Sequence, residues 1–302
     1  MSPMENHITI CICTYRRPEL LRGLLEKIAK QKTDGLFNIS IIVVDNDLNE
    51  SARDAVNSFK RKQLINIDYY CEPEQNISLA RNMAVRNAKG SFIAFIDDDE
   101  FPDDRWLMIL LKAYYDYGGD GIQGPVYPSY QDGIPKWVIK GKFYNGPNYP
   151  SGLVLTWSQG RTGNLFLRKE IFDNPENLFS PQFGRGAEDQ DFIRRAIAKG
   201  YVFMYCHEAI VYEHIPLLRC KRTFLLKRAL LRGKISLLHP ISKIRLVMMS
   251  CVAIPIYTAS LPLLLAFGHH LFMKYLVKDF DHIGRLLAFL GFDVVKEKYV
   301  SE

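Results

Sequence analysis

Short apolar runs alternate with amphipathic segments through the first hundred residues of this chain. Apolar runs of strand length occupy residues 8–14, 39–45, 65–70 and 91–96. Between them, apolar residues recur at helical spacing in residues 18–30, 51–62 and 77–88. Strands that alternate with helices form right-handed crossovers around a mostly parallel sheet. The pattern therefore predicts an α/β domain with helices on both faces of its sheet.

Polar residues follow each of the four apolar runs, where the predicted strands end. These polar segments are residues 14–16, 45–47, 72–76 and 97–100. Parallel strands bring their carboxyl ends to one edge of a sheet, and ligands bind at that edge. A single segment of this kind is explained as well by a solvated turn. Four of them at one edge predict a polar pocket.

The fourth polar segment is a run of four acids, Asp97, Asp98, Asp99 and Glu100, directly after the apolar residues 92–96. Four adjacent carboxylates repel one another unless a cation or hydrogen-bond donors compensate their charge. Mg²⁺ and Mn²⁺ bind one or two carboxylates together with substrate phosphates. In an extended segment Asp97 and Asp99 point to the same side. The run indicates a divalent cation site, although solvated acid runs are also common.

Five segments resemble, in order, the motifs of family 2 glycosyltransferases, which have the GT-A fold. They are residues 13–18, 43–46, 76–82, 97–99 and 186–191, and the resemblance covers residues 7–215. It implies a GT-A catalytic domain over residues 1–215 and a nucleotide-sugar donor. It also implies a saccharide or lipid-linked saccharide acceptor. Glu100 and Asn46 depart from the pattern, since Asp is frequent at both positions in the family.

The resemblance assigns the nucleotide-sugar to a set of strand-end and helix residues: Thr14, Arg16, Asp45, Arg81, Asp97 and Asp98. In this assignment Thr14 and Arg16 line the nucleotide and diphosphate pocket. Asp45 hydrogen-bonds the base, commonly uracil, and Asp97 contacts the ribose. Arg81 lies near the base or the diphosphate.

Metal binding and catalysis are assigned in the same way. Mn²⁺ or Mg²⁺ would be held by Asp99, with Asp97 and His214 as further ligands. Asp189 would be the catalytic base, and Glu188 would position hydroxyl groups. Asp189 begins a predicted helix at residues 189–199, and a helix N-terminus favours an ionised carboxylate. Acids are common in the first turn of any helix, so the residues alone favour that simpler explanation.

Residues 127–160 are rich in proline, glycine and aromatic side chains. The segment is too long and irregular for a simple connection, which predicts a functional loop or lid. Its aromatic rings suit an acceptor sugar, because they stack on sugar C–H surfaces. An equally good explanation is that the rings fold the loop against the domain.

The basic charge of the chain is confined to one segment. Residues 215–245 contain nine Lys or Arg and no acid, which leaves 30 basic and 33 acidic residues elsewhere. The stretch 219–245 is amphipathic, which predicts a helix on an anionic leaflet. A nucleic-acid patch is the alternative, but the stretch adjoins an apolar run and not a reading motif. No nucleic-acid partner is therefore expected.

Residues 246–270 carry no formal charge over 25 positions. This run is long enough to span a bilayer, although Pro255 and Pro262 predict a kink. The run either spans the bilayer or enters it and returns, and a buried helical hairpin is the alternative. A second amphipathic helix is expected at residues 269–292. We therefore expect residues 216–302 to be a membrane-associated helical region.

The location follows from charge and cysteine usage. The basic flank predicts that the N-terminal side is cytoplasmic. The six cysteines show no paired or zinc-ligand spacing, which favours a reducing compartment. Residues 1–12 lack the pattern of a signal peptide. The expected location is the cytoplasmic face of the membrane, which is the inner membrane if the source is bacterial.

The predicted function is that of an inverting glycosyltransferase with a UDP-linked donor, acting in the synthesis of cell-surface polysaccharide or glycolipid. One alternative is a nucleotidyltransferase of related fold. The absence of glycine from residues 13–17 argues against it. The other alternative is a membrane-bound nucleotide-sugar-binding protein that has lost catalysis. The presence of Asp99 and Asp189 argues against that loss.

Overall fold

The structure is a computed structural model that describes residues 6–184, 186–238 and 241–292. The chain forms two compact units. Within the described residues, the first unit holds 6–128 and 146–214, and the second holds 129–145 and 215–292. Residues 129–145 thus join the helices that follow residue 215, although they lie far from them in the sequence.

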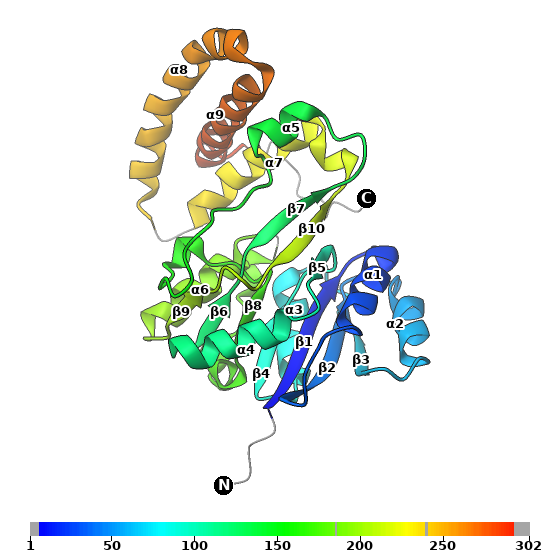
Figure 1. The fold of residues 1–302 in the computed structure, drawn as a ribbon. Helices are drawn as coiled ribbons and strands as arrows, with labels where there is room; N and C mark the ends of the chain where they lie inside the picture. The colour runs from blue at the N-terminus through cyan, green and yellow to red at the C-terminus, as the bar shows by residue number, and fades with distance from the viewer. Residues whose placement is uncertain (1–5, 185, 239–240, 293–302) are drawn as a thin grey trace. The chain divides into compact units, whose positions relative to one another are not determined.

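The first unit contains a mixed sheet, seven-stranded among the described residues, in the order β3-β2-β1-β4-β8-β6-β9 (Figure 1). Its strands, in that order, are Asn66–Cys71, Phe37–Asp45, Asn6–Thr14, Phe92–Phe95, Leu165–Arg168, Gly121–Gln123 and Phe203–Tyr205. The first four strands are parallel, whereas β8 is antiparallel to β4 and β6. The predicted β/α alternation is confirmed.

Helices cover both faces of this sheet (Figure 1). On one face lie α1 (Pro18–Ile28), α2 (Arg53–Lys60) and α4 (Trp106–Tyr117), which share a core with Ile8, Ile10 and Ile12 of β1. On the other face lie α3 (Ile77–Asn87) and α6 (Glu188–Ala198), which share a core with Ile93 and Phe95 of β4. Alternate residues of each buried strand therefore contact opposite helix layers.

A small second sheet follows the acidic run. Its order is β5-β10-β7, with bounds Glu100–Pro102, Val211–Ile215 and Val126–Tyr130. β10 runs antiparallel to β5, and Glu213 pairs with Glu100 in this register. Beyond that pair, the His214 amide donates a 2.7 Å hydrogen bond to the Asp99 carbonyl. These bonds place His214 beside the backbone of the acidic run.

The second unit is helical. It contains α5 (Lys136–Gly141), α7 (Arg222–Ile235), α8 (Lys243–Phe267) and α9 (His269–Phe289). Short 3₁₀ segments lie in both units, at Trp157–Gln159, Lys169–Asp173, Pro175–Asn177, Pro181–Phe183, Leu217–Cys220 and Ser236–Leu238. The glycines of α7 and α9 allow close helix contact, because a Cβ on Gly233 would lie 2.1 Å from the Asp281 carbonyl oxygen.

Two expectations from the sequence need correction here. Residues 127–160 are not one irregular lid, because they include most of β7 and all of α5. Trp137, Phe143 and Tyr144 pack in the core of the second unit, as the simpler explanation of these aromatics required. The basic stretch 219–245 is not one helix either, since α7 ends at Ile235 and α8 begins at Lys243.

Helix α8 is the helix among the described residues that is long and apolar enough to cross a membrane. Its apolar window has a mean hydropathy of 1.8, and only 6% of that window is buried within the protein. Pro255 and Pro262 both lie inside the helix, which runs continuously through them. The length and composition of α8 both suit a membrane-spanning helix, and its apolar surface is exposed.

Candidate active site

The acidic run lies at the carboxyl end of β4, as predicted, and most of it is buried. Asp98, Asp99 and Glu100 are each no more than 6% exposed. Asp98 accepts a 2.8 Å hydrogen bond from the Thr14 hydroxyl at the end of β1. The Arg17 guanidinium lies 3.1 Å from a carboxylate oxygen of both Asp98 and Asp99. The loop after β1 thus holds the acidic run in place.

The side chain of Glu100 folds back against the first residue of the acidic run. Its carboxylate accepts a 3.1 Å hydrogen bond from the backbone amide of Asp97. Gly163 lies against the same carboxylate, and a Cβ at this position would come within 2.5 Å of a Glu100 oxygen. The next residue, Asn164, is fully buried and binds the Trp106 indole and two backbone carbonyls. The segment 163–164 therefore supports the acidic run through packing and hydrogen bonds.

Arg81 joins the acidic run to the start of α6. One guanidinium nitrogen lies 3.4 Å from an Asp97 carboxylate oxygen, and another forms a short ion pair with Glu188. Its side chain is 7% exposed and lies 5.7 Å from the centre of the Phe179 ring. Residues 81, 97 and 188, which are far apart in the sequence, thus meet at one guanidinium group.

Burial raises the pKa values of four carboxyl groups among the described residues of this cluster, Asp97, Asp98, Glu100 and Glu188. It raises the pKa of Asp98 to about 7, although the Arg17 guanidinium acts in the opposite direction. Burial also raises the pKa of Glu188 to about 7 against the effect of Arg81. The pKa values of Asp97 and Glu100 are raised for the same reason. Among the described residues, one buried Glu188 oxygen has no hydrogen-bond partner, which is costly unless a ligand satisfies it.

Asp189 is half-buried at the start of α6 and accepts a 2.7 Å hydrogen bond from the Gln190 amide. It lies close enough to Asp97 for its charge to contribute to the raised pKa of that carboxyl group. The preceding Ala187 has a left-handed backbone with φ of 67°. Such strained positions are found at functional sites, where the surroundings enforce them.

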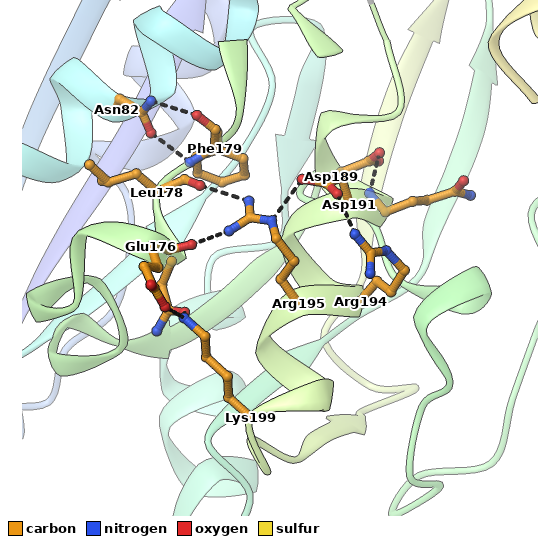
Figure 2. Close-up of polar contacts among 11 residues, drawn as sticks. Asn82, Glu176, Leu178, Phe179, Asp189, Asp191, Arg194, Arg195 and Lys199 are labelled. Atoms are coloured by element: carbon orange, nitrogen blue, oxygen red, sulfur yellow. Dashed lines mark hydrogen bonds and ion pairs between the residues drawn. The ribbon is translucent and has the colours of Figure 1, made fainter. Parts of the chain in front are cut away.

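A network of polar contacts fixes α6 to α3, the helix that carries Arg81 (Figure 2). Asp191 of α6 accepts hydrogen bonds from Arg194 and Arg195, and Arg195 also donates to the Leu178 carbonyl at 2.7 Å. Asn82 of α3 exchanges two 2.8 Å hydrogen bonds with the backbone of Phe179. The loop at residues 176–179 is therefore clamped from both sides, which holds Glu188 opposite Arg81.

Two asparagine side chains, Asn46 and Asn76, connect the end of β2 to the start of α3 and to the Pro181 carbonyl. The Asn46 side chain accepts a 3.0 Å hydrogen bond from the Asn76 amide. The Asn76 side chain caps α3 through the Ser78 and Leu79 amides, and it donates to the Pro181 carbonyl. These asparagines belong to the motifs noted in the sequence, but their positioning roles were not predicted. Asn76 directly before the helical pattern of residues 77–88 was the available signal, because asparagine is a strong N-cap residue.

The remaining donor-site candidates lie at the ends of β1 and β2. Arg16 is exposed and pairs with Asp47 at 3.0 Å. Asp45 is fully buried and accepts hydrogen bonds from the Ala52 and Asp47 amides and from the Tyr69 hydroxyl. Its carboxylate is therefore satisfied by the chain itself. Arg17 lies in the motif at residues 13–18, but no role was predicted for it. Arg17, and not Arg16, contacts the acidic run.

The fit of a divalent cation can be judged from the donor groups. Among residues 6–184, 186–238 and 241–292, no three His, Cys, Asp or Glu side chains are grouped so that they could hold a metal ion. Mn²⁺ and Mg²⁺ do not need such a group, because they bind one or two carboxylates plus substrate phosphates. A buried run of adjacent carboxyl groups suits such a cation.

Comparisons with known proteins identify the family of the chain. The model of the family described as glycosyl transferase family 2 matches residues 9–174. The succinoglycan biosynthesis protein ExoM of Rhizobium meliloti is 34% identical over 230 residues, which cover 76% of this chain and 73% of ExoM. The chain therefore belongs to glycosyl transferase family 2, and it is a glycosyltransferase.

Two solved structures show a similar fold at low sequence identity. Residues 1–349 of S. aureus TarS, in complex with UDP-GlcNAc, align with a TM-score of 0.53 and 16% identity, over 73% of this chain and 66% of that one. The mannosyltransferase PcManGT from Pyrobaculum calidifontis, in complex with GDP-Man and Mn²⁺, aligns with a TM-score of 0.53 and 20% identity, over 76% and 62%. The GT-A fold expected from the sequence is confirmed.

Proposed function

We propose that this glycosyltransferase moves a sugar from a UDP-linked donor to a hydroxyl group of a saccharide or lipid-linked saccharide, with inversion at the anomeric carbon. The relatives support this choice, since one is named for succinoglycan biosynthesis and a TarS structure contains UDP-GlcNAc. Synthesis of a cell-surface polysaccharide or glycolipid is the corresponding role.

The observation that carries the proposal is the position of Arg81 between Asp97 and Glu188. An inverting transfer needs one set of carboxylates near the leaving diphosphate and a separate base near the acceptor hydroxyl. Arg81 joins the end of β4 to the start of α6, so the two sets lie next to each other. In our proposal Asp189 accepts the proton of the acceptor hydroxyl, and Glu188 positions that hydroxyl through its unpartnered oxygen.

The environment of Asp189 supports its role as the base. It lies in the first turn of α6 with Glu188 and Asp191. This turn is the positive end of the helix dipole, which is a favourable place for a negatively charged group. The clamp between α6 and α3 fixes its backbone, so little motion is needed to reach the reacting geometry.

The donor is proposed to lie along the ends of β1, β2 and β4. Its contacts are Thr14, Arg16, Asp45, Arg81, Asp97 and Asp98. Asp45 is fully buried, so it can bond the base only if a neighbouring side chain such as Tyr69, which donates to it, moves aside. Asp98 already engages Thr14 and Arg17, so its contribution is to hold those two residues in place.

We further propose that transfer depends on Mn²⁺ or Mg²⁺ held by Asp99, with Asp97 and His214 nearby. When bound, such a cation would stabilise the negative charge of the leaving diphosphate. The chain's own part is to fix the acids, which Arg17 does for Asp99 and Arg81 does for Asp97. His214 is held to the Asp99 backbone by the β10 amide.

The test uses labelled UDP-sugars, Mn²⁺ and a membrane extract as the acceptor source, with UDP release as the readout. We expect Asp189→Asn to lower transfer by a factor of about 10² to 10⁴ while UDP binding is unchanged. Asp99→Asn should abolish transfer and the Mn²⁺ dependence of UDP binding. Asp116→Asn, at an exposed acid paired with Lys112, is the matched control.

Other outcomes of this test would contradict the proposal. Full transfer in the Asp189 or Asp99 variant would remove the role assigned to that residue. Nucleotide transfer from UTP to a sugar phosphate, with release of pyrophosphate, would indicate a nucleotidyltransferase. Binding of UDP-sugars without any turnover across donors and acceptors would indicate a binding protein.

The place of action is proposed to be the cytoplasmic face of a membrane, with residues 216–302 as the membrane-associated region. Helix α8 supports this proposal through its length, apolar composition and exposure. The nine basic residues at positions 215–245 support it through their attraction to anionic lipid.

A further inference from the structure

Helix α8 is apolar around its whole circumference, yet its two sides face different surroundings. One side packs against α9, and the other is exposed. The exposed side carries a row of large apolar residues at intervals of mostly four positions: Ile244, Met248, Val252, Ile256, Leu263 and Phe267. Each of these side chains is at least 60% exposed. An exposed apolar row of this length indicates an interaction surface.

The side of α8 that faces α9 is held by polar contacts. Thr258 donates a 2.9 Å hydrogen bond to Asp279, which is 3% exposed. Ser250 lies 3.0 Å from both the His282 ring and the Arg285 guanidinium. We call these five residues the polar seam. The seam fixes the part of α8 between Ser250 and Thr258 to α9.

Helix α9 is not suited to the interior of a bilayer. It carries Lys274 and Lys278 on its exposed surface, in addition to the charged residues of the polar seam. It is also bound to α7, where Arg232 makes two 3.0 Å contacts with Asp281. At Gly284 a Cβ would come within 2.3 Å of the Leu230 carbonyl oxygen of α7, so the two helix backbones touch.

We propose that α8 lies in the plane of an anionic leaflet and does not cross the membrane. The inference rests on the membrane association proposed above and specifies its geometry. If α8 crossed the bilayer with the polar seam intact, it would carry the charges of α9 into the hydrocarbon, which is strongly unfavourable. An in-plane helix keeps the seam and buries the exposed apolar row among acyl chains.

The charges of the second unit identify the leaflet. Exposed basic residues lie on α7 and at the start of α8: Arg222, Lys227, Arg228, Arg232, Lys243 and Arg245. No acid occurs between residues 215 and 245. Lys243 and Arg245 adjoin the first members of the apolar row, so anionic headgroups can meet the charges while the row enters the acyl region.

Sidedness of labelling decides between the two geometries. Single cysteines replace exposed lysines in the full-length chain carrying Cys251→Ser. One is at Lys274 of α9, and the other is at Lys60 of α2 in the first unit. A membrane-impermeant maleimide is applied to inside-out vesicles and to spheroplasts of expressing bacterial cells. The Cys251→Ser chain gives the background.

We expect both Lys274→Cys and Lys60→Cys to be labelled in inside-out vesicles and neither in spheroplasts. Labelling of Lys274→Cys only in spheroplasts would show that α8 crosses the membrane and would overturn the proposal. Recovery of the chain in the soluble fraction would overturn it as well. UDP release by the same preparations is measured separately, so a failure of the membrane geometry is distinguishable from a failure of sugar transfer.

Vesicle flotation tests the surface itself. Vesicles of phosphatidylglycerol and phosphatidylcholine are compared with vesicles of phosphatidylcholine alone. The double variant Met248→Glu, Val252→Glu should bind the anionic vesicles about tenfold more weakly. Leu36→Glu, at an exposed apolar residue of the first unit, is the matched control and should bind as the parent does. Equal binding by the double variant, or by neutral vesicles, would contradict the proposal.

Discussion

The ends of β2 and β4 both carry buried carboxylates, but the two sites are satisfied in different ways. At β2, Asp45 receives two backbone amides and the Tyr69 hydroxyl, so its hydrogen bonds come from its own neighbourhood. At β4, the acidic run and Glu188 form ion pairs with two guanidinium groups among the described residues, those of Arg17 and Arg81. One Glu188 oxygen has no hydrogen-bond partner in the part of the chain that the structure describes.

This difference separates a carboxylate that is stable without a ligand from carboxylates that a ligand would stabilise. A buried acid that local donors satisfy stabilises a turn and needs no ligand. A group of buried acids with few cations is held in an unfavourable state, which a cation or substrate hydroxyl relieves. The predictions below test whether the β4 site depends on long-range charge pairs while the β2 site does not.

The largest effect is expected from Arg81→Met. This change leaves Glu188 buried without its charge partner, which costs about 3–5 kcal/mol of unfolding free energy. Urea denaturation measures that loss, and transfer should fall with it because Glu188 and Asp97 lose their common anchor. Lys112→Met removes an exposed ion pair with Asp116 and is the matched control, with an expected change of about 0–1 kcal/mol. A similar small change for Arg81→Met would contradict the comparison.

The second prediction concerns pH. Burial raises the pKa of Glu188 to about 7, so the folded chain holds this proton where the unfolded chain has released it. Unfolding free energy should therefore fall as pH rises from about 4.5 to 7, by up to about 3 kcal/mol for this group. Asp97, Asp98 and Glu100 change in the same direction.

Thermal or urea unfolding across this pH range checks the sign. Glu188→Gln should reduce the decline without removing it. Glu208 provides the opposite case, because its hydrogen bond from Ser151 holds its pKa below the usual value. Glu208→Gln should leave the decline in place. If stability rose with pH in the parent chain, the assignment of raised pKa values to this cluster would be wrong.

A smaller effect is expected from Gly163→Ala. The new methyl group would lie 2.5 Å from a Glu100 oxygen and push that carboxylate from the Asp97 amide. We expect a loss of about 1–3 kcal/mol in stability and a reduced transfer rate. Gly23→Ala in α1 is the control, since its Cβ meets only the Phe101 ring, at 3.1 Å, and alanine favours a helix. A loss of stability for Gly163→Ala as small as that for Gly23→Ala would show that the acidic run tolerates displacement.

The first hundred residues illustrate what the sequence alone could predict. The alternation of apolar runs and helical patterns predicted every strand of β1 to β4 within two residues, because apolar side chains of these strands pack on both faces of the sheet. The acidic run was found because four acids after a buried strand are unusual. The family resemblance gave Glu188 and Asp189, which their spacing alone did not distinguish from ordinary first-turn acids.

Contacts between distant segments could not be predicted. No pattern in the sequence indicates that Arg81 pairs with Glu188, 107 positions away, or that Asn82 binds the backbone of Phe179. The geometry of the second unit could not be predicted from the sequence either. The apolar run at residues 246–270 fits a spanning helix by composition, and only the polar seam with α9 argues against it.

The smallest effect is expected from Tyr69→Phe, which tests the β2 side of the comparison. The change removes the 3.0 Å hydrogen bond to Asp45 and leaves both backbone amides in place. We expect a loss of about 1 kcal/mol in unfolding free energy, because the carboxylate keeps most of its partners. UDP affinity, measured by calorimetry, should be unchanged or higher, since the freed oxygen of Asp45 becomes available to a base. A clear fall in UDP affinity would instead mean that the tyrosine hydroxyl itself shapes the base pocket. The β2 site would then be functional in the same sense as the β4 site.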